Sequence, residues 1–155
     1  MSKIQEFLKN QEKSVMSIVE GKTIIDYLNT NAEEAPDYPA LNTPINNEYT
    51  GWDSTSWSEY QETVHNLASG LIDIGIQAED NAFIVANNVK EHFISDLGIM
   101  HAGAVPSTIY KQLKSGQIEY ISNLLEAKVA FVGDAELFTE VNKAKDNCPD
   151  MKYII

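Results

Sequence analysis

NAFIVANNVKEHFISDLGIMHAGAVPSTIY, residues 81–110, has the pattern of a strand, a helix and a second strand. The short apolar run at residues 83–86 is rich in β-branched side chains and predicts a buried strand. Residues 89–102 place apolar side chains at helical spacing, and residues 104–110 return to extended chain. Two strands joined by a helix of this length usually lie parallel, with a right-handed crossover between them.

The ends of this predicted helix are marked by residues that break regular structure. Asn87 and Asn88 interrupt the first strand and can cap the helix, and Gly103 ends it. The helix is expected to bury one stripe of side chains: Val89, Phe93, Leu97 and Met100. Gly103 and Ala104 are expected to let the helix approach the next strand closely, so Gly103→Val should be strongly destabilising.

The chain after residue 110 repeats the same alternation. Residues 117–125 and 135–147 have helical periodicity, with Ser115 and Asp134 as predicted caps. Residues 128–133 and 151–155 are apolar runs that predict strands. The inward side chains are expected to be Ile118, Ile121, Leu124, Leu125, Leu137, Phe138, Val141 and Ala144. This order predicts an α/β fold, an open and mostly parallel sheet with helices on both faces.

A helix, a hairpin and a second helix are predicted before this sheet. Thr23 with Asp26, and Ser56 with Glu59, have the spacing of capping boxes that begin the two helices. The first helix ends before Pro36, and the second has Gly75 as its C-terminal cap. The hairpin is expected to pair residues 38–43 with residues 52–56.

Residues 2–21 have apolar side chains on one stripe of an amphipathic helix. Such a helix binds a membrane surface or a partner, packs on its own domain, or is a frayed terminus. Its three lysines are balanced by three glutamates, so it lacks the basic bias of a membrane-surface helix, and packing or fraying is favoured. We therefore divide the chain into an N-terminal helix, residues 1–22, and an α/β subdomain, residues 23–155.

The composition limits the function classes. The chain has 155 residues and a formal net charge of −12. A strongly acidic chain is a poor partner for nucleic acid or an anionic membrane. We find no apolar window long enough to span a bilayer and no signal-peptide core. Cys148 is the single cysteine, which excludes an intrachain disulfide, and the expected location is cytoplasmic.

The histidines do not form a recognisable catalytic or metal-binding pattern. His92 and Asp96 are four residues apart and could pair, but a His–Asp pair without a facing nucleophile is not a triad. His65 and His101 are interpreted as packed or surface residues. No two of the three histidines have the spacing of a metal-binding pair on one helical face.

Other candidate groups are also given structural roles. Cys148 lies near Asp146 and Asp150, whose carboxylates disfavour a reactive thiolate. Glu33 and Glu34 point in different directions on a helix and are expected to be solvated. No loop has a glycine-rich phosphate-binding motif or a nucleophile elbow. We therefore predict no catalytic, cofactor-binding or metal-binding residue in this chain.

Several motifs together resemble the N-terminal part of AMP-forming acyl-CoA synthetases, in the adenylate-forming ligase superfamily. They are TIIDYL at residue 23, PDYPAL at residue 36, SWSEY at residue 56, LASGL at residue 67, DLGIMHAGAVPSTIY at residue 96, QIEYI at residue 117 and AKVAFV at residue 127. Glu79 stands where that family usually has glycine before Asp80. The GAVPSTIY form is most similar to long-chain fatty acid–CoA ligases.

This resemblance implies a function for a longer protein. Such synthetases activate a carboxylate with ATP and Mg²⁺, release pyrophosphate and transfer the acyl group to CoA. The family's phosphate loop, ribose-binding acid, hinge and catalytic lysine match no position here, so the chain is expected to be an inactive fragment. Its expected partners are the remaining subdomains and, in the whole enzyme, a fatty acid; the expected location is cytoplasmic or peripheral to a membrane.

Two alternatives use the same fold. One is a free-standing, non-catalytic binding or interaction module, and the other is an autonomous flavodoxin-like nucleotide binder, which rests on fold class alone. If the chain is a fragment, the surface that later subdomains would cover should be apolar and exposed. The isolated chain is then expected to self-associate or to be marginally stable.

Overall fold

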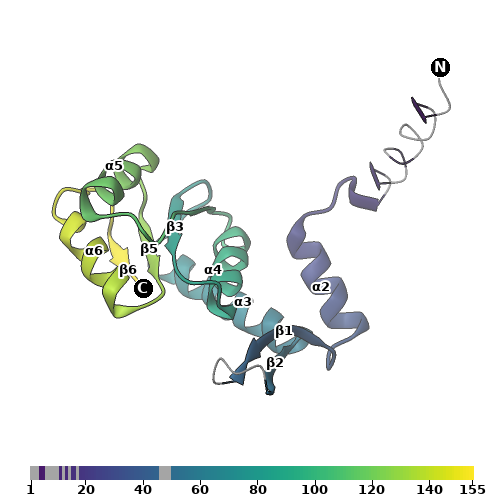
Figure 1. Cartoon of the computed structure of the whole chain (residues 1–155). Coiled ribbons are helices and arrows are strands. Elements are labelled where there is room, and N and C mark those ends of the chain that lie inside the picture. The colour runs from purple at the N-terminus through teal and green to yellow at the C-terminus, as the bar shows by residue number, and fades with distance from the viewer. Residues whose placement is uncertain (1–3, 6–10, 12, 14, 17, 46–49) are drawn as a thin grey trace.

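A computed structural model describes residues 4, 5, 11, 13, 15, 16, 18–45 and 50–155. Figure 1 shows a helical layer on each side of a sheet, with a separate hairpin and an N-terminal helix beyond. The elements are α2 (Ile24–Glu34), β1 (Pro39–Pro44), β2 (Trp52–Ser56), α3 (Trp57–Asp73), β3 (Asn81–Val85), α4 (Lys90–His101), β4 (Val105–Thr108), α5 (Ser115–Leu125), β5 (Val129–Val132), α6 (Ala135–Lys145) and β6 (Tyr153–Ile154).

The sheet confirms the predicted architecture. Its strand order is β4-β3-β5-β6, and every neighbouring pair is parallel. The central strand β3 pairs Phe83 with Ser107 on one side and with Ala130 on the other. The predicted hairpin is also present, because β1 and β2 pair in antiparallel register.

The core divides between the two faces of the sheet, as the period of two along a strand requires. Phe83 and Val85 pack with residues of α5 and α6. Ala82 and Ile84 pack on the opposite face with residues of α3 and α4, among them Leu71 and Ile99. A third apolar cluster joins α2, α3 and α4 through Leu28, Tyr60, Val64 and Leu97.

Both predicted capping boxes are formed. The backbone N–H of Asp26 donates to the Thr23 hydroxyl, and the N–H of Thr23 donates to the Asp26 carboxylate. Ser56 and Glu59 make the same reciprocal pair at the start of α3. Each pair satisfies backbone donors that the first helical turn leaves free.

Two predicted caps are wrong. The residue before α4 is Val89, not Asn87 or Asn88, and it makes no side-chain capping bond. Ser115 is the first residue of α5 and not its cap. The backbone N–H of Ser115 instead donates to the Glu140 carboxylate, 3.1 Å away on α6.

Three apolar residues predicted to face the core are exposed. Phe93 is 48% exposed, Leu124 69% and Phe138 47%. The buried faces of α4 and α5 instead include residues that were not predicted, Gly98 and Ile99 in α4 and Ser122 in α5. The contact faces of these two helices are therefore displaced from the apolar stripe.

Part of the predicted helix over residues 2–21 lies outside the described residues. The described positions there include Ile4, Val15, Met16 and Ile18, which have helical backbone and exposed side chains. Within the part of the chain that the structure describes, no helix combines the length and apolarity needed to cross a bilayer.

Candidate functional site

The candidate site lies at the carboxyl edge of the sheet, between β3 and β5. These strands are neighbours, and Val85 pairs with Val132 at their ends. The chain leaves β3 into α4 on one face and leaves β5 into α6 on the other. Ligands of open α/β sheets bind at such a reversal of strand order, beyond the carboxyl ends of the strands.

The two strand ends approach each other closely at Gly133. Its N–H donates to the carbonyl of Val85 over 2.9 Å. A Cβ at Gly133 would lie 2.8 Å from Ala86 Cβ and 2.9 Å from Ala86 Cα. Because the Ala86 backbone cannot move aside cheaply, glycine at this position is what allows the two loops to pack together.

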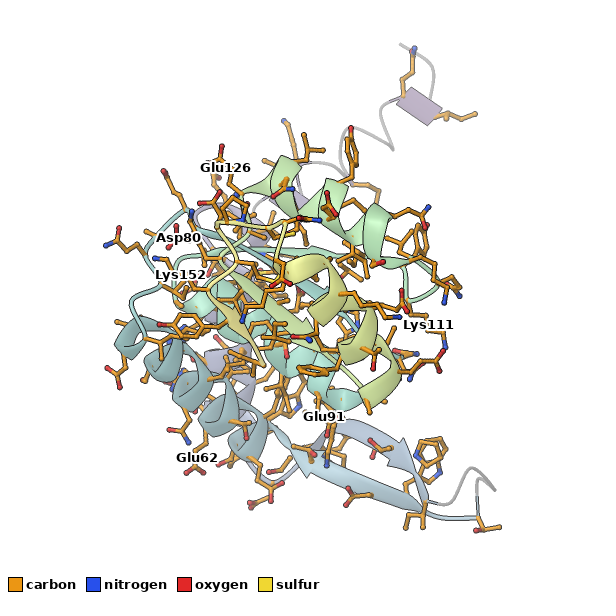
Figure 2. The ribbon with its side chains drawn as sticks, turned by 90° about the vertical axis from the view of Figure 1, so that its left-hand side faces the viewer. Glu62, Asp80, Glu91, Lys111, Glu126 and Lys152 are labelled. Atoms are coloured by element: carbon orange, nitrogen blue, oxygen red, sulfur yellow. The ribbon has the colours of Figure 1, made fainter. Side chains whose placement is uncertain are left out.

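Polar side chains from three loops meet at this edge. Lys111 Nζ donates to Asn87 Oδ1 over 2.6 Å, and Asn87 Nδ2 donates to Asp134 Oδ2 over 3.3 Å. The three residues follow β4, β3 and β5, respectively. A hollow of about 500 Å³ lies beside them, bordered also by Lys114 and Glu136. Figure 2 shows Lys111 at this edge, opposite Asp80, Glu126 and Lys152 at the amino ends of the strands.

A larger and more apolar hollow, of about 630 Å³, opens on the face of the sheet that carries α3 and α4. Its lining includes Leu67, Ile84, Val89, Ile94, Phe131 and Ile155. Lys90 and His92, on the first turn of α4, form part of its polar rim. Lys90 is fixed by an ion pair to Asp53 of the hairpin, with 3.1 Å between Nζ and Oδ2.

The predicted pairing of His92 with Asp96 is not among the hydrogen bonds of the described residues. His92 Nε2 instead lies 3.0 Å from the hydroxyl of Thr108, at the end of β4. Burial raises the pKa of Asp96, and the nearby charge of His92 lowers it in part. Burial, with a smaller effect from Asp96, raises the pKa of Tyr60 to about 12. Tyr60 therefore stays neutral, and its hydroxyl donates to the carbonyl of Phe93.

The remaining candidate residues lie away from the carboxyl edge. His65 and His101 stack on each other between α3 and α4. Cys148 is buried in the core under α5 and α6, and Glu33 and Glu34 are exposed. Among the described residues, no three or more His, Cys, Asp and Glu side chains gather closely enough to hold a metal ion.

The bridge of Asn87, Lys111 and Asp134 was not predicted from the sequence. Each residue lies in a loop that follows a predicted strand, and in a parallel sheet such loops meet at the edge where ligands bind. Because these loops contain no glycine-rich phosphate motif, no site residue was predicted in them.

Comparison with known proteins identifies the family. Residues 28–155 match the family described as AMP-binding enzyme. The chain belongs to this family.

Solved structures share its fold. An anthranilate CoA ligase, AuaEII, solved with anthranoyl-AMP, has a TM-score of 0.77 at 21% identity. The match covers 86% of this chain and 24% of that ligase. A fatty acyl CoA synthetase of Mycobacterium tuberculosis has a TM-score of 0.74 at 19% identity, covering 85% and 26%.

Relatives of this chain include proteins named as long-chain-fatty-acid–CoA ligases. The Drosophila melanogaster protein named long-chain-fatty-acid–CoA ligase heimdall is 28% identical over 148 residues. That alignment covers 94% of this chain and 22% of the Drosophila protein. The chain thus spans about a fifth of the length of this relative.

Proposed function

We propose that this chain is the N-terminal subdomain of an ATP-dependent, AMP-forming ligase that joins a long-chain fatty acid to CoA. In that reaction the carboxylate attacks the α-phosphorus of ATP and displaces pyrophosphate. The thiol of CoA then attacks the acyl carbon and displaces AMP. The observation that carries the proposal is the family match over residues 28–155, together with relatives that are named long-chain-fatty-acid–CoA ligases.

The chain's own residues fit a supporting role better than a catalytic one. The N-terminus of α6 is capped by Asp134, whose Oδ1 accepts from the N–H of Leu137 over 2.8 Å. Asp134 and Glu136 place carboxylates beside Lys111 and Lys114. A phosphate-binding helix end needs free amides and a positive surrounding. Here Asp134 occupies one amide of α6, and its carboxylate and that of Glu136 offset the charges of the two lysines.

We therefore assign ATP, Mg²⁺ and CoA to parts of the ligase outside residues 1–155. These residues would supply the sheet, the carboxyl edge and the apolar hollow of about 630 Å³ against which the remaining subdomains pack. Residues 23–155 form the subdomain in this proposal, and residues 1–22 form a separate N-terminal helix. The proposed location is the cytoplasm or the periphery of a membrane.

The test uses the coding sequence and the gene product. A reading frame that continues past residue 155 into a Thr/Ser/Gly-rich loop followed by lysine supports the proposal, and a stop codon there favours a free-standing module. The product of the complete frame is then incubated with ATP, CoA and fatty acids of different chain lengths. We expect AMP, pyrophosphate and acyl-CoA in equal amounts. Formation of ADP, or no reaction with any fatty acid, would contradict the proposed chemistry.

A further inference from the structure

Two of the three histidines of the chain lie face to face between α3 and α4. The ring centroids of His65 and His101 are 4.5 Å apart, and the ring planes differ by 14°. Two imidazolium rings in this arrangement would place like charges almost in contact. The stack therefore tolerates two neutral rings, or one neutral and one charged ring. It disfavours two charged rings.

His65 is the more enclosed member of the stack. Its Nε2 is buried and has no hydrogen-bond partner among the described residues, whereas the side chain of His101 is exposed.

The surroundings of His101 also disfavour its protonated form. Burial lowers the pKa of His101, and the nearby charge of His65 lowers it further. The acidic groups on the surrounding elements have other positions or partners. On α3 they are Glu59, which caps the helix, Glu62, which Figure 2 shows pointing outward, and Asp73, the last residue of the helix. On α4 they are Glu91 in the first turn and Asp96, which acts on His92 and Tyr60. In the loop after α3, the carboxylate of Asp80 accepts from the N–H of Gln77, and Glu79 precedes it.

We propose that the stack of His65 on His101 makes the packing of α4 against α3 sensitive to acid, between about pH 7 and pH 5. The contact also bears on the apolar hollow. Leu67, two residues after His65, lines that hollow and packs under α4 at Gly98. When both rings carry a proton, their repulsion acts between α3 and α4 and loosens one wall of the hollow. The structure thus contains a proton-sensitive contact beside the candidate site.

The direction of the effect follows from the lowered pKa. The folded chain holds fewer protons on His101 than the unfolded chain, in which the pKa of histidine is about 6.5. The stabilisation is fully present above that value and is lost as the pH falls through the lower pKa of the folded state.

Urea unfolding at about pH 7.5 and about pH 5.5 tests the proposal. His101 is exposed, so His101→Gln should fold. Ser69→Ala is the control, because Ser69 is an exposed residue of α3 that lies outside the stack and carries no titratable group. We expect acidification to raise the unfolding constant less in His101→Gln than in the parent, because the variant lacks the group whose pKa folding lowers. The control should behave as the parent does. Equal acid sensitivity of all three proteins would overturn the proposal.

Proton NMR titration measures the pKa of His101 directly. That pKa would not change on substitution of His65 if His65 only filled space. In His65→Gln the imidazole C2–H signal of His101 should titrate at a higher pH than in the parent, because the neighbouring charge is gone. An unchanged titration of His101 would contradict the proposed coupling. If His65→Gln does not fold, the unfolding comparison with His101→Gln decides the question by itself.

Discussion

Leu67 on α3 fills the space that a side chain at Gly98 on α4 would need. A Cβ at Gly98 would lie 2.5 Å from Leu67 Cδ2, 2.8 Å from its Cγ and 3.1 Å from its Cβ. The whole leucine side chain would have to move, and not only its flexible end. The closest approach of these two helices thus depends on a glycine that intrinsic helix propensity disfavours.

Gly98→Ala is therefore expected to destabilise the chain by about 1–3 kcal/mol through overpacking, despite the better helix propensity of alanine. Gly70→Ala on α3 is the matched control. A Cβ at Gly70 meets nothing within 4 Å, so this variant should be more stable by roughly 0.5–1 kcal/mol. Chemical denaturation measures both. If both variants are more stable than the parent, the Leu67 side chain moves aside without a loss of stability, which would contradict the prediction.

Gly103 is required for a different reason from the one the sequence suggests. A Cβ there would lie 3.4 Å from Ala78 Cβ, an ordinary contact, but the backbone has a φ of +81°. Left-handed backbone is costly for β-branched residues and tolerable for asparagine. We expect Gly103→Val to lose a few kcal/mol and Gly103→Asn to lose about 1 kcal/mol or less. Equal losses on chemical denaturation would point to crowding and not to backbone conformation.

The sequence predicts the elements well because their signals are local. Capping boxes at Thr23 and Ser56, glycines after helices and apolar strand runs all act within a few residues. The side chains that face the core depend instead on how helices meet. Phe93 and Leu124 have helical spacing and are nevertheless exposed, since the contact surface is set by small residues such as Gly98 and Ser122. Periodicity alone cannot identify these positions.

The site was less predictable than the fold. Asn87, Lys111 and Asp134 are separated by 24 and 23 positions in the sequence, and only the strand order brings them together. The stack of His65 on His101 likewise depends on the crossing of α3 and α4. Such contacts require the topology and the helix packing, which motif spacing does not contain.

The capping box of α3 should respond to acid. Bonds from the backbone and hydroxyl of Ser56 lower the pKa of Glu59. The stabilisation that the Glu59 carboxylate gives the folded chain is therefore fully present above the ordinary pKa of glutamate. It is lost as the pH falls through the lowered pKa of the folded state. We expect Glu59→Gln to weaken the dependence of stability on pH between about 6 and 3. Thermal unfolding across this range measures it, and a pH dependence identical to the parent's would contradict this role of Glu59.

The isolated chain should self-associate or be marginally stable. Ile155 is 51% exposed beside the apolar hollow, and it continues the edge strand through its N–H bond to the Ala130 carbonyl. Exposed apolar surface at a strand edge favours association. Sedimentation should show a mass that rises with concentration, and Ile155→Lys should reduce it. A stable monomer that is insensitive to dilution would contradict this prediction.

Exchange of labelled pyrophosphate into ATP in the presence of a long-chain fatty acid tests whether the ligase adenylates the fatty acid carboxylate. Exchange occurs only if the carboxylate is adenylated reversibly, so it isolates the first proposed step. We predict exchange by the protein extended to the length of its relatives, dependent on the fatty acid, and none by residues 1–155 alone. Exchange by residues 1–155 alone, or none by the extended protein with any carboxylic acid, would contradict the account.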